Sequence, residues 1–222
     1  MGAGCPCEAE ELAPDWGGLP ESALAAVAAA CCARGAARAA CVCRRWRAAA
    51  RSSAPLREEL ALRGAGAPWR LALGCCLGGL RSLDLHFVPL RGAAGPLARS
   101  GALSSLRSLS LNSCSGLCAR SCVAIAGACG PALRFCDLSG TGADEDAVDA
   151  LGEATGGALT ALSLRGCRAV GARREDGVGR SLEKRLLAAL PGLIELLVAR
   201  TQLDDTRVAH LHAKYAWVGA KG

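Results

Sequence analysis

The sequence predicts an α/β solenoid, in which short parallel strands alternate with helices and each unit packs against its neighbours. The first observation is a repeat: the pattern Leu-x-x-Leu-x-Leu begins at residues 80, 106, 133, 159 and 193, at intervals of 26, 27, 26 and 34 residues. The second is composition, because the chain is 51% apolar but only 3% aromatic, and much of the remainder is alanine. Such small side chains make a thin compact core, whereas a repeat array buries each leucine at a fixed position.

Each copy of the pattern predicts one short strand with an inward and an outward face. Side chains alternate along a strand, so Leu83 and Leu85 are expected to face the stack while Asp84 and His86 face outward. In the third copy Cys136 replaces a leucine, and the copy that begins at residue 193 is degenerate. We therefore expect a ladder of outward, mostly polar side chains along one side of the array.

The segments between the strands read as helices. The pattern predicts helices at residues 118–129 and 144–155. In the second, Asp144 is a suitable N-cap, and Val148 and Leu151 lie three apart on one face.

The fourth interval exceeds the first by eight residues, 34 minus 26, and the excess falls in the charged, glycine-bounded stretch 171–179. This stretch is predicted to be a surface loop. It is either a tolerated insertion or a segment with contacts of its own.

Ahead of the repeats, residues 15–62 predict a small helical module. A Leu-Pro pair opens its first helix, in which Leu24 and Val27 share one face, and further helices are expected at 36–50 and 55–60. Three short helices with few large side chains make a marginal domain. The module is therefore expected to need a partner.

At two places the sequence resembles known families. A cysteine follows the strand by three residues at Cys114 and Cys167, which resembles the cysteine-containing subtype of leucine-rich repeat. The Leu19-Pro20 pair and the run from Cys43 to Trp46 resemble an F-box. Together they resemble the F-box proteins with cysteine-containing leucine-rich repeats, which implies a leucine-rich-repeat solenoid preceded by a three-helix F-box module.

The resemblance also implies roles for particular residues. In that family the F-box binds a Skp-type adaptor, which binds a cullin, and the repeats bind a target protein that is to be ubiquitinated. The residues carried over as adaptor-facing or module-core positions are Leu19, Pro20, Leu24, Val27, Val42, Cys43 and Trp46. The expected target-binding positions on the outward strand ladder are Asp84, His86, Ser110, Asn112, Phe135, Asp137, Ser163 and Arg165. Such a subunit is not an enzyme and acts by proximity.

The resulting layout has five parts. They are a flexible N-terminus (1–14), the F-box-like module (15–62), a linker or cap (63–79), about five leucine-rich repeats (80–214) and a C-terminal tail (215–222). Two other interpretations stay open. One is a stand-alone repeat scaffold whose N-terminal helices cap the solenoid, and the other, less favoured, is a GTPase-activating repeat protein of the Ran type.

The sequence argues against catalysis and against a metal or cofactor. The three histidines pair with no cysteine or serine motif, and no phosphate loop or His-Glu-x-x-His motif is present. The paired cysteines at 5/7, 31/32, 41/43 and 75/76 lack the two-to-four-residue gap of a zinc knuckle. Cys118 and Cys122 have a three-residue gap, but they are expected on one face of a repeat helix.

Charge and cysteine content bear on partners and compartment. The net charge of +6 comes mainly from arginine without interleaved aromatic residues, so nucleic acid is not expected as a partner. No secretory signal precedes the 14 cysteines, which predicts reduced thiols in the cytoplasm or nucleus. The longest uncharged apolar run, residues 24–33, is too short for the ~20 residues that a membrane span needs.

Overall fold

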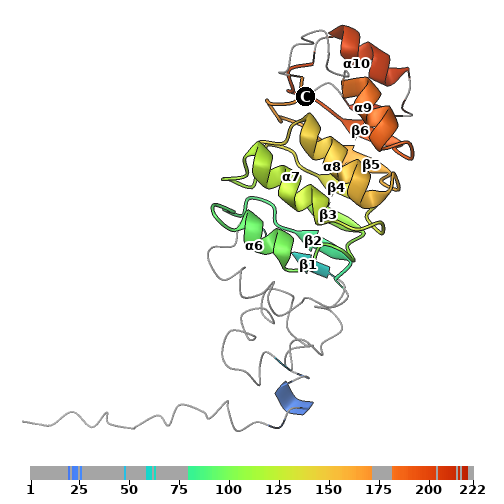
Figure 1. The fold of residues 1–222 in the computed structure, drawn as a ribbon. Helices are drawn as coiled ribbons and strands as arrows, with labels where there is room; N and C mark the ends of the chain where they lie inside the picture. Colours follow the sequence, from blue (N-terminus) through green and yellow to red (C-terminus); the bar gives the residue numbers. More distant parts are fainter. Residues whose placement is uncertain are drawn as a thin grey trace, which may run out of the picture.

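The computed structural model describes residues 80–171, 182–203 and 205–213 continuously, together with residues 20, 22–24, 26, 48, 59–61, 63, 215 and 217–219. Within these residues the chain forms a stack of strand–helix units (Figure 1). The strands are β1 (Glu59–Ala61), β2 (Ser82–Asp84), β3 (Ser108–Ser110), β4 (Phe135–Asp137), β5 (Ala161–Ser163), β6 (Glu195–Leu197) and β7 (Trp217–Gly219). The helices with full bounds are α6 (Ala94–Arg99), α7 (Ala119–Gly127), α8 (Glu145–Thr155), α9 (Leu182–Ala189) and α10 (Asp205–His212).

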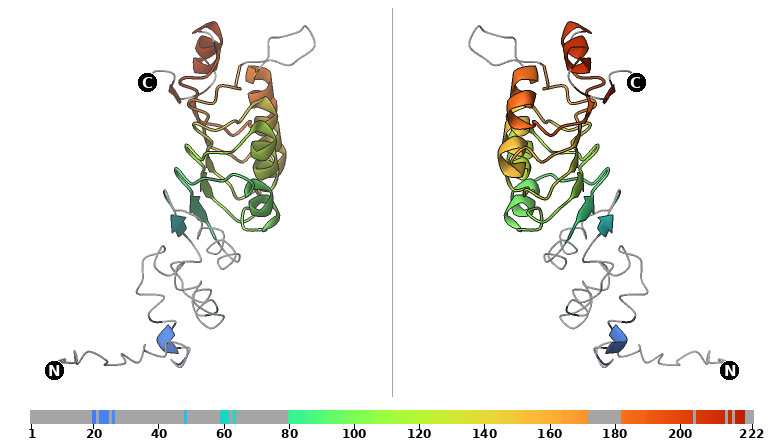
Figure 2. Two further views of the ribbon diagram at one scale, coloured as in Figure 1. Left: turned by 90° about the vertical axis from the view of Figure 1, so that its left-hand side faces the viewer. Right: turned by 90° about the vertical axis from the view of Figure 1, so that its right-hand side faces the viewer.

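The strands form one parallel sheet in the order β1 to β7, so every strand pairs with its neighbours in the sequence. The register keeps equivalent residues of successive repeats side by side; for example, Ser82 pairs with Ser108, which pairs with Phe135. The strands line one side of the stack, and α6 to α9 lie on the other (Figure 2). The predicted α/β class, with parallel strands and helices, is confirmed, and the stack is compatible with a leucine-rich-repeat-like solenoid. The predicted three-helix module is not tested, because most of residues 15–62 lie outside the described residues.

The core consists of the leucines that define the repeat. In the first copy Leu80, Leu83 and Leu85 are at most 1% exposed, and the equivalent positions of the later copies are also buried. Cys136 occupies a leucine position and is fully buried. These leucines belong to one hydrophobic cluster that runs through the repeats. Burying one leucine contributes about 1.5–3 kcal/mol, so neighbouring repeats stabilise one another.

The helix boundaries agree closely with the sequence pattern. Asp144 caps α8 as predicted, because its Oδ1 accepts a hydrogen bond from the backbone N–H of Ala147 at 3.2 Å. The α8 helix ends at Gly156, whose φ of +58° favours glycine. The α7 helix is shorter than the predicted 118–129: Cys118 is its N-cap, in an extended conformation, and Ala128 is its C-cap.

Both ends of the sheet differ from the predicted layout. Glu59 and Leu60 were expected in a helix of the N-terminal module, but they belong to β1, which pairs with β2. Residues 217–219 were assigned to the tail, but they form β7 and pair with β6. The physical reason is that β2 and β6 would otherwise present unpaired backbone groups, and one further strand at each end satisfies them.

Part of the sequence prediction lies outside the described residues. Of the F-box-like positions, Leu19, Val27, Val42, Cys43 and Trp46 are outside them, as is the inserted loop from residue 172. In the described part, a helical turn follows Pro20, whose carbonyl accepts hydrogen bonds from the backbone N–H groups of Ala23 and Leu24.

Candidate functional site

The candidate site is the strand side of the sheet, which the described helices α6 to α9 leave uncovered (Figure 2). We distinguish two rows of residues that run across the strands. The leading row comprises the residues directly before β2 to β6, which are Arg81, Arg107, Arg134, Thr160 and Ile194. The trailing row comprises the last residues of the same strands, which are Asp84, Ser110, Asp137, Ser163 and Leu197. The sheet register places the members of each row on adjacent strands.

The carboxylates of the trailing row are held by hydrogen bonds within the protein. In Asp137, Oδ1 accepts from the backbone N–H of Ser139 at 2.9 Å, and Oδ2 accepts from the Asn112 side-chain amide at 3.2 Å. In Asp84, Oδ1 accepts from the backbone N–H of His86 at 3.0 Å, and Oδ2 from Arg63 Nε at 2.6 Å. These acids therefore fix the loops that follow their strands, and their charges are already partly compensated.

Ser163 differs from the prediction that it faces outward and is accessible. Its exposed fraction is 3%, and its hydroxyl shares a 2.7 Å hydrogen bond with that of Ser139. Because the side chain turns toward the preceding repeat, it offers little surface to a partner. Ser163 is better described as part of the interface between repeats.

Other predicted residues are accessible. Arg165 is exposed, Phe135 is 38% exposed, and Ser110 and His86 are partly exposed. The ring of His86 lies 4.6 Å from that of Phe87, centroid to centroid. The outward orientation predicted for these positions agrees with the structure, whereas their contact with a target stays a prediction.

Phe87 was not among the predicted residues; it is 64% exposed and has a φ of +58°. A bulky residue rarely adopts this left-handed conformation. The same corner recurs with positive φ two residues after the last pattern position of every repeat, at Phe87, Ser113, Gly140, Gly166 and Arg200. The glycines at this fixed offset were the signal that could have identified the corner.

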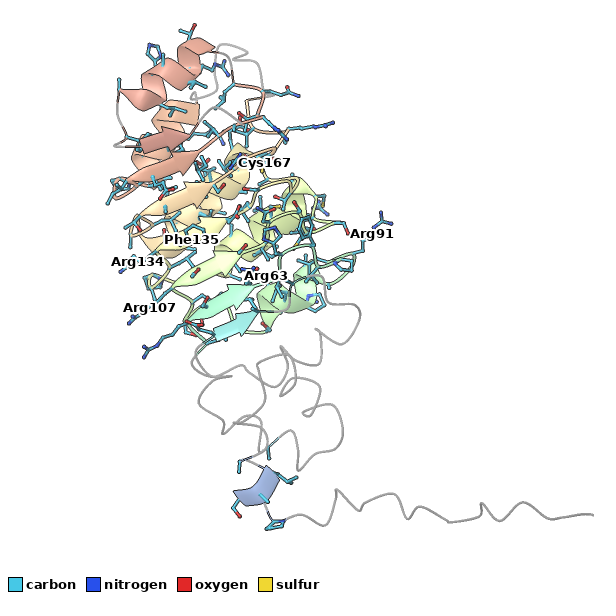
Figure 3. All side chains as sticks on the ribbon, turned by 180° about the vertical axis from the view of Figure 1, so that it is seen from behind. Arg63, Arg91, Arg107, Arg134, Phe135 and Cys167 are labelled. Atoms are coloured by element: carbon cyan, nitrogen blue, oxygen red, sulfur yellow. The ribbon has the colours of Figure 1, made fainter. Side chains whose placement is uncertain are left out.

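The leading row was not predicted either, because its residues lie directly before the strands and not at the outward strand positions. Figure 3 shows Arg107 and Arg134 at the same end of neighbouring strands. Arg134 is held in place: its Nη1 donates to the carbonyls of Pro131, at 2.8 Å, and Leu133, at 3.0 Å. The signal was the second position of the repeat pattern, which reads Arg, Arg, Arg, Thr, Ile through the copies.

The repeat cysteines have a structural explanation. Cys114 Sγ donates to the carbonyl of Leu85 at 2.9 Å, and Cys167 Sγ donates to that of Leu138 at 3.1 Å. Each bond reaches the strand end of the preceding repeat. Burial raises the pKa of Cys114 to about 11 and also raises that of Cys167, so both thiols keep the proton that they donate. A small apolar side chain with one donor suits this position.

Cys118 differs from these buried thiols because it is exposed. A hydrogen bond between its Sγ and the Ser121 hydroxyl, at 3.3 Å, lowers its pKa from the ordinary value. In the part of the chain that the structure describes, no cluster of three or more His, Cys, Asp or Glu side chains is arranged to hold a metal ion. The helices of that same part include none with the length and apolarity to cross a membrane.

No protein-family model matches the chain, and no curated protein matches it. Among solved structures, it is similar to a chain in the crystal structure of the Rad7 and Elc1 complex in yeast, with 26% identity and a TM-score of 0.39. The match covers 64% of this chain and 33% of the other, so this chain spans about a third of that protein's length.

Proposed function

We propose that the chain is the substrate-recognition subunit of a Skp-cullin-F-box ubiquitin ligase. The module at residues 15–62 binds the Skp-type adaptor, and the strand side of the sheet binds the target. The chain itself does no chemistry and works in the cytoplasm or nucleus. It raises the effective concentration of the target near the ubiquitin carrier.

The strand side supports the target-binding half of the proposal. Its side chains stand on short strands whose ends are fixed by the Asp84 and Asp137 hydrogen bonds, so little ordering is needed when a partner binds. Phe135 and Arg165 offer an aromatic ring and a guanidinium, and both residue types are enriched in protein interfaces relative to the rest of the surface. This uncovered, pre-ordered face is the observation that carries the proposal.

The adaptor-binding half rests on the resemblance of the N-terminal segment to an F-box. The resemblance leaves open whether each position faces the adaptor or lies in the core of the module, and the structure describes two of these positions, Pro20 and Leu24. Leu24 is fully buried, which favours a place inside the module, while Pro20 is exposed at the start of the helical turn, which favours contact with the adaptor. We propose these roles for the two residues.

One observation favours the scaffold alternative. Because β1 at Glu59–Ala61 extends the sheet, the chain just before the repeats continues the solenoid as a cap does. A repeat scaffold without an adaptor has the same strand side and the same cap. The two functions differ in whether the chain binds a Skp-type adaptor.

The deciding experiment is co-purification of the full chain with a purified Skp-type adaptor and, through it, a cullin. The proposal expects a complex that the Leu19→Ala/Pro20→Ala double variant weakens at least tenfold. The matched control is Phe135→Ala/Arg165→Ala, which changes the strand side and should leave adaptor binding unchanged. If the wild-type chain does not bind the adaptor, the scaffold function replaces the ligase function.

A further inference from the structure

The leading row has a composition that the proposed function does not explain. It carries three consecutive exposed arginines, followed by Thr160 and an isoleucine, Ile194, that is 56% exposed. We infer that this row binds an extended segment of the target, about six residues long, with acidic side chains at one end and an apolar side chain at the other. The inference rests on the proposed target-binding role of the strand side and specifies the partner's chemistry.

The first step is the charge. Arg81 and Arg107 make no hydrogen bond or ion pair with any described side chain, and Arg134 bonds two backbone carbonyls. Adjacent strands are about 4.8 Å apart, so three like charges stand close together. Their repulsion is relieved when carboxylates lie between them, which favours an acidic ligand.

The second step is that β2, β3 and β4, the strands that follow the three arginines, do not begin with an acid. The strand acids at this edge are Glu59 and Glu195, at the starts of β1 and β6. Asp84 and Asp137 stand at the opposite ends of their strands and are held by neighbouring donors. The three arginines of the leading row therefore stand at one edge of β2 to β4, while the aspartates of these strands are engaged at the other edge. An acidic segment is attracted to the leading edge without displacing an existing ion pair.

The third step is the apolar end of the row. Three large hydrophobic side chains are exposed among the described residues, and two of them, Phe135 and Ile194, lie at this edge. Glu195 at the start of β6 disfavours acid there. The side chains at this edge therefore change from basic beside β2–β4 to apolar beside β4–β6. This change orients a bound segment that carries acidic side chains at one end and an apolar side chain at the other.

The fourth step is the length. From Arg81 to Ile194 the row crosses four strand spacings, a distance of about 19 Å. An extended chain advances about 3.3 Å per residue, so roughly six residues span it. Side chains two apart share a face, so a segment with acidic, acidic and apolar residues at alternate positions meets the arginines first and Phe135 or Ile194 last.

A single-stranded nucleic acid is the other polyanion that three arginines attract. Binding of that kind uses aromatic side chains on which successive bases stack. Phe135 is the one aromatic side chain described in β2 to β6, and the row ends two strands further on in an apolar isoleucine. The row therefore favours a protein segment over a nucleic acid.

The test measures binding of the full chain to a fluorescein-labelled, glycine-based peptide with two glutamates and one leucine at alternate positions. The Arg107→Glu variant should weaken binding about fivefold or more, since even an exposed ion pair contributes up to ~1 kcal/mol and reversal also adds repulsion. The matched control is Arg120→Glu, the same charge change at an exposed site on α7, on the helix side. It should change binding less than twofold.

Three further probes define the specificity. Replacing both glutamates by glutamine, or the leucine by glycine, should weaken binding, and raising the salt concentration should weaken it as well. The inference is overturned if the glutamate peptide does not bind, or if Arg107→Glu and Arg120→Glu act alike. It is also overturned if only a phosphoserine version of the peptide or a single-stranded RNA oligonucleotide binds.

Failure here is distinguishable from failure of the proposed function. Co-purification of the Arg107→Glu variant with the Skp-type adaptor should match the wild type. If the adaptor binds and the peptide does not, the ligase proposal stands and the acidic-segment inference falls. Thermal unfolding of both arginine variants checks that the fold is retained, as expected for exposed side chains.

Discussion

Replacing glycine by alanine is expected to have opposite effects on stability at two helical positions, Gly152 and Gly127. A β-carbon at Gly152 of α8 would lie 2.4 Å from the Ala189 β-carbon, 2.6 Å from its carbonyl oxygen and 2.8 Å from its α-carbon. A β-carbon at Gly127, the last residue of α7, would meet nothing within 4 Å. Gly152 is therefore a point of close approach between α8 and α9, whereas Gly127 faces open space.

The magnitudes follow from two opposing effects. Replacing glycine by alanine inside a helix gains up to ~1 kcal/mol. Overpacking costs about 1–3 kcal/mol, and the upper end applies to Gly152→Ala because ordinary contact begins at 3.4 Å, 1.0 Å beyond the 2.4 Å available. We expect Gly152→Ala to lower the unfolding free energy by about 2 kcal/mol, and Gly127→Ala to raise it by about 0.5 kcal/mol, since a terminal helix position gains less.

The assay is thermal and urea unfolding of the full chain, followed by circular dichroism. For a chain of 222 residues, about 2 kcal/mol corresponds to a fall in Tm of roughly 4–8 °C. Adding Ala189→Gly should restore only part of the loss, because the carbonyl oxygen of residue 189 still lies in the way. If Gly152→Ala unfolds at or above the wild-type temperature, the close α8–α9 contact is wrong.

Three other predictions concern single side chains. Asp137→Ala should lower the free energy of unfolding, measured in urea, by about 1–3 kcal/mol, because the Ser139 N–H and the Asn112 amide lose a charged acceptor. A loss of stability no larger than that caused by Ser110→Ala would contradict this. Phe87→Asn should leave the free energy of unfolding unchanged or raise it by up to ~1 kcal/mol, since asparagine tolerates a φ of +58° better than phenylalanine. In the same assay, a loss above ~1 kcal/mol would count against backbone strain at this corner. Peptide mapping after maleimide labelling should show that Cys118 reacts faster than Cys114 or Cys167. Cys118 should also keep reacting as the pH falls, because its pKa is lowered while the pKa values of the other two thiols are raised. Equal rates in the folded protein would contradict the described burial.

Much of the repeat was predictable because it depends on local pattern. The spacing of Leu80, Leu83 and Leu85 determined which side chains are buried, and Asp144 marked the start of α8. The ends of the sheet were not predictable in this way. Three-residue strands such as β1 and β7 have almost no pattern of their own, and they form by pairing with β2 and β6.

The candidate site was predicted only in part, for a related reason. Alternation along the strand correctly placed Asp84, Phe135 and Asp137 on the outward side. It could not show that Ser163 turns into the interface between repeats, because that depends on the hydroxyl of Ser139, 24 residues away. The alternation pattern also could not show that the carboxylates are already hydrogen-bonded within the protein, whereas the arginines of the leading row are exposed to a partner.

The sequence by itself determined the period, the buried leucines and the α/β class, because each depends on side-chain type at fixed spacing along the chain. The tertiary structure decided which outward residues are accessible, because neighbouring repeats place groups about 26 residues apart within hydrogen-bonding distance. Thus the pairing of Asp137 with Asn112, the alignment of Arg81, Arg107 and Arg134, and the close contact at Gly152 all arise from stacking. They are properties of adjacent repeats that no single repeat has alone.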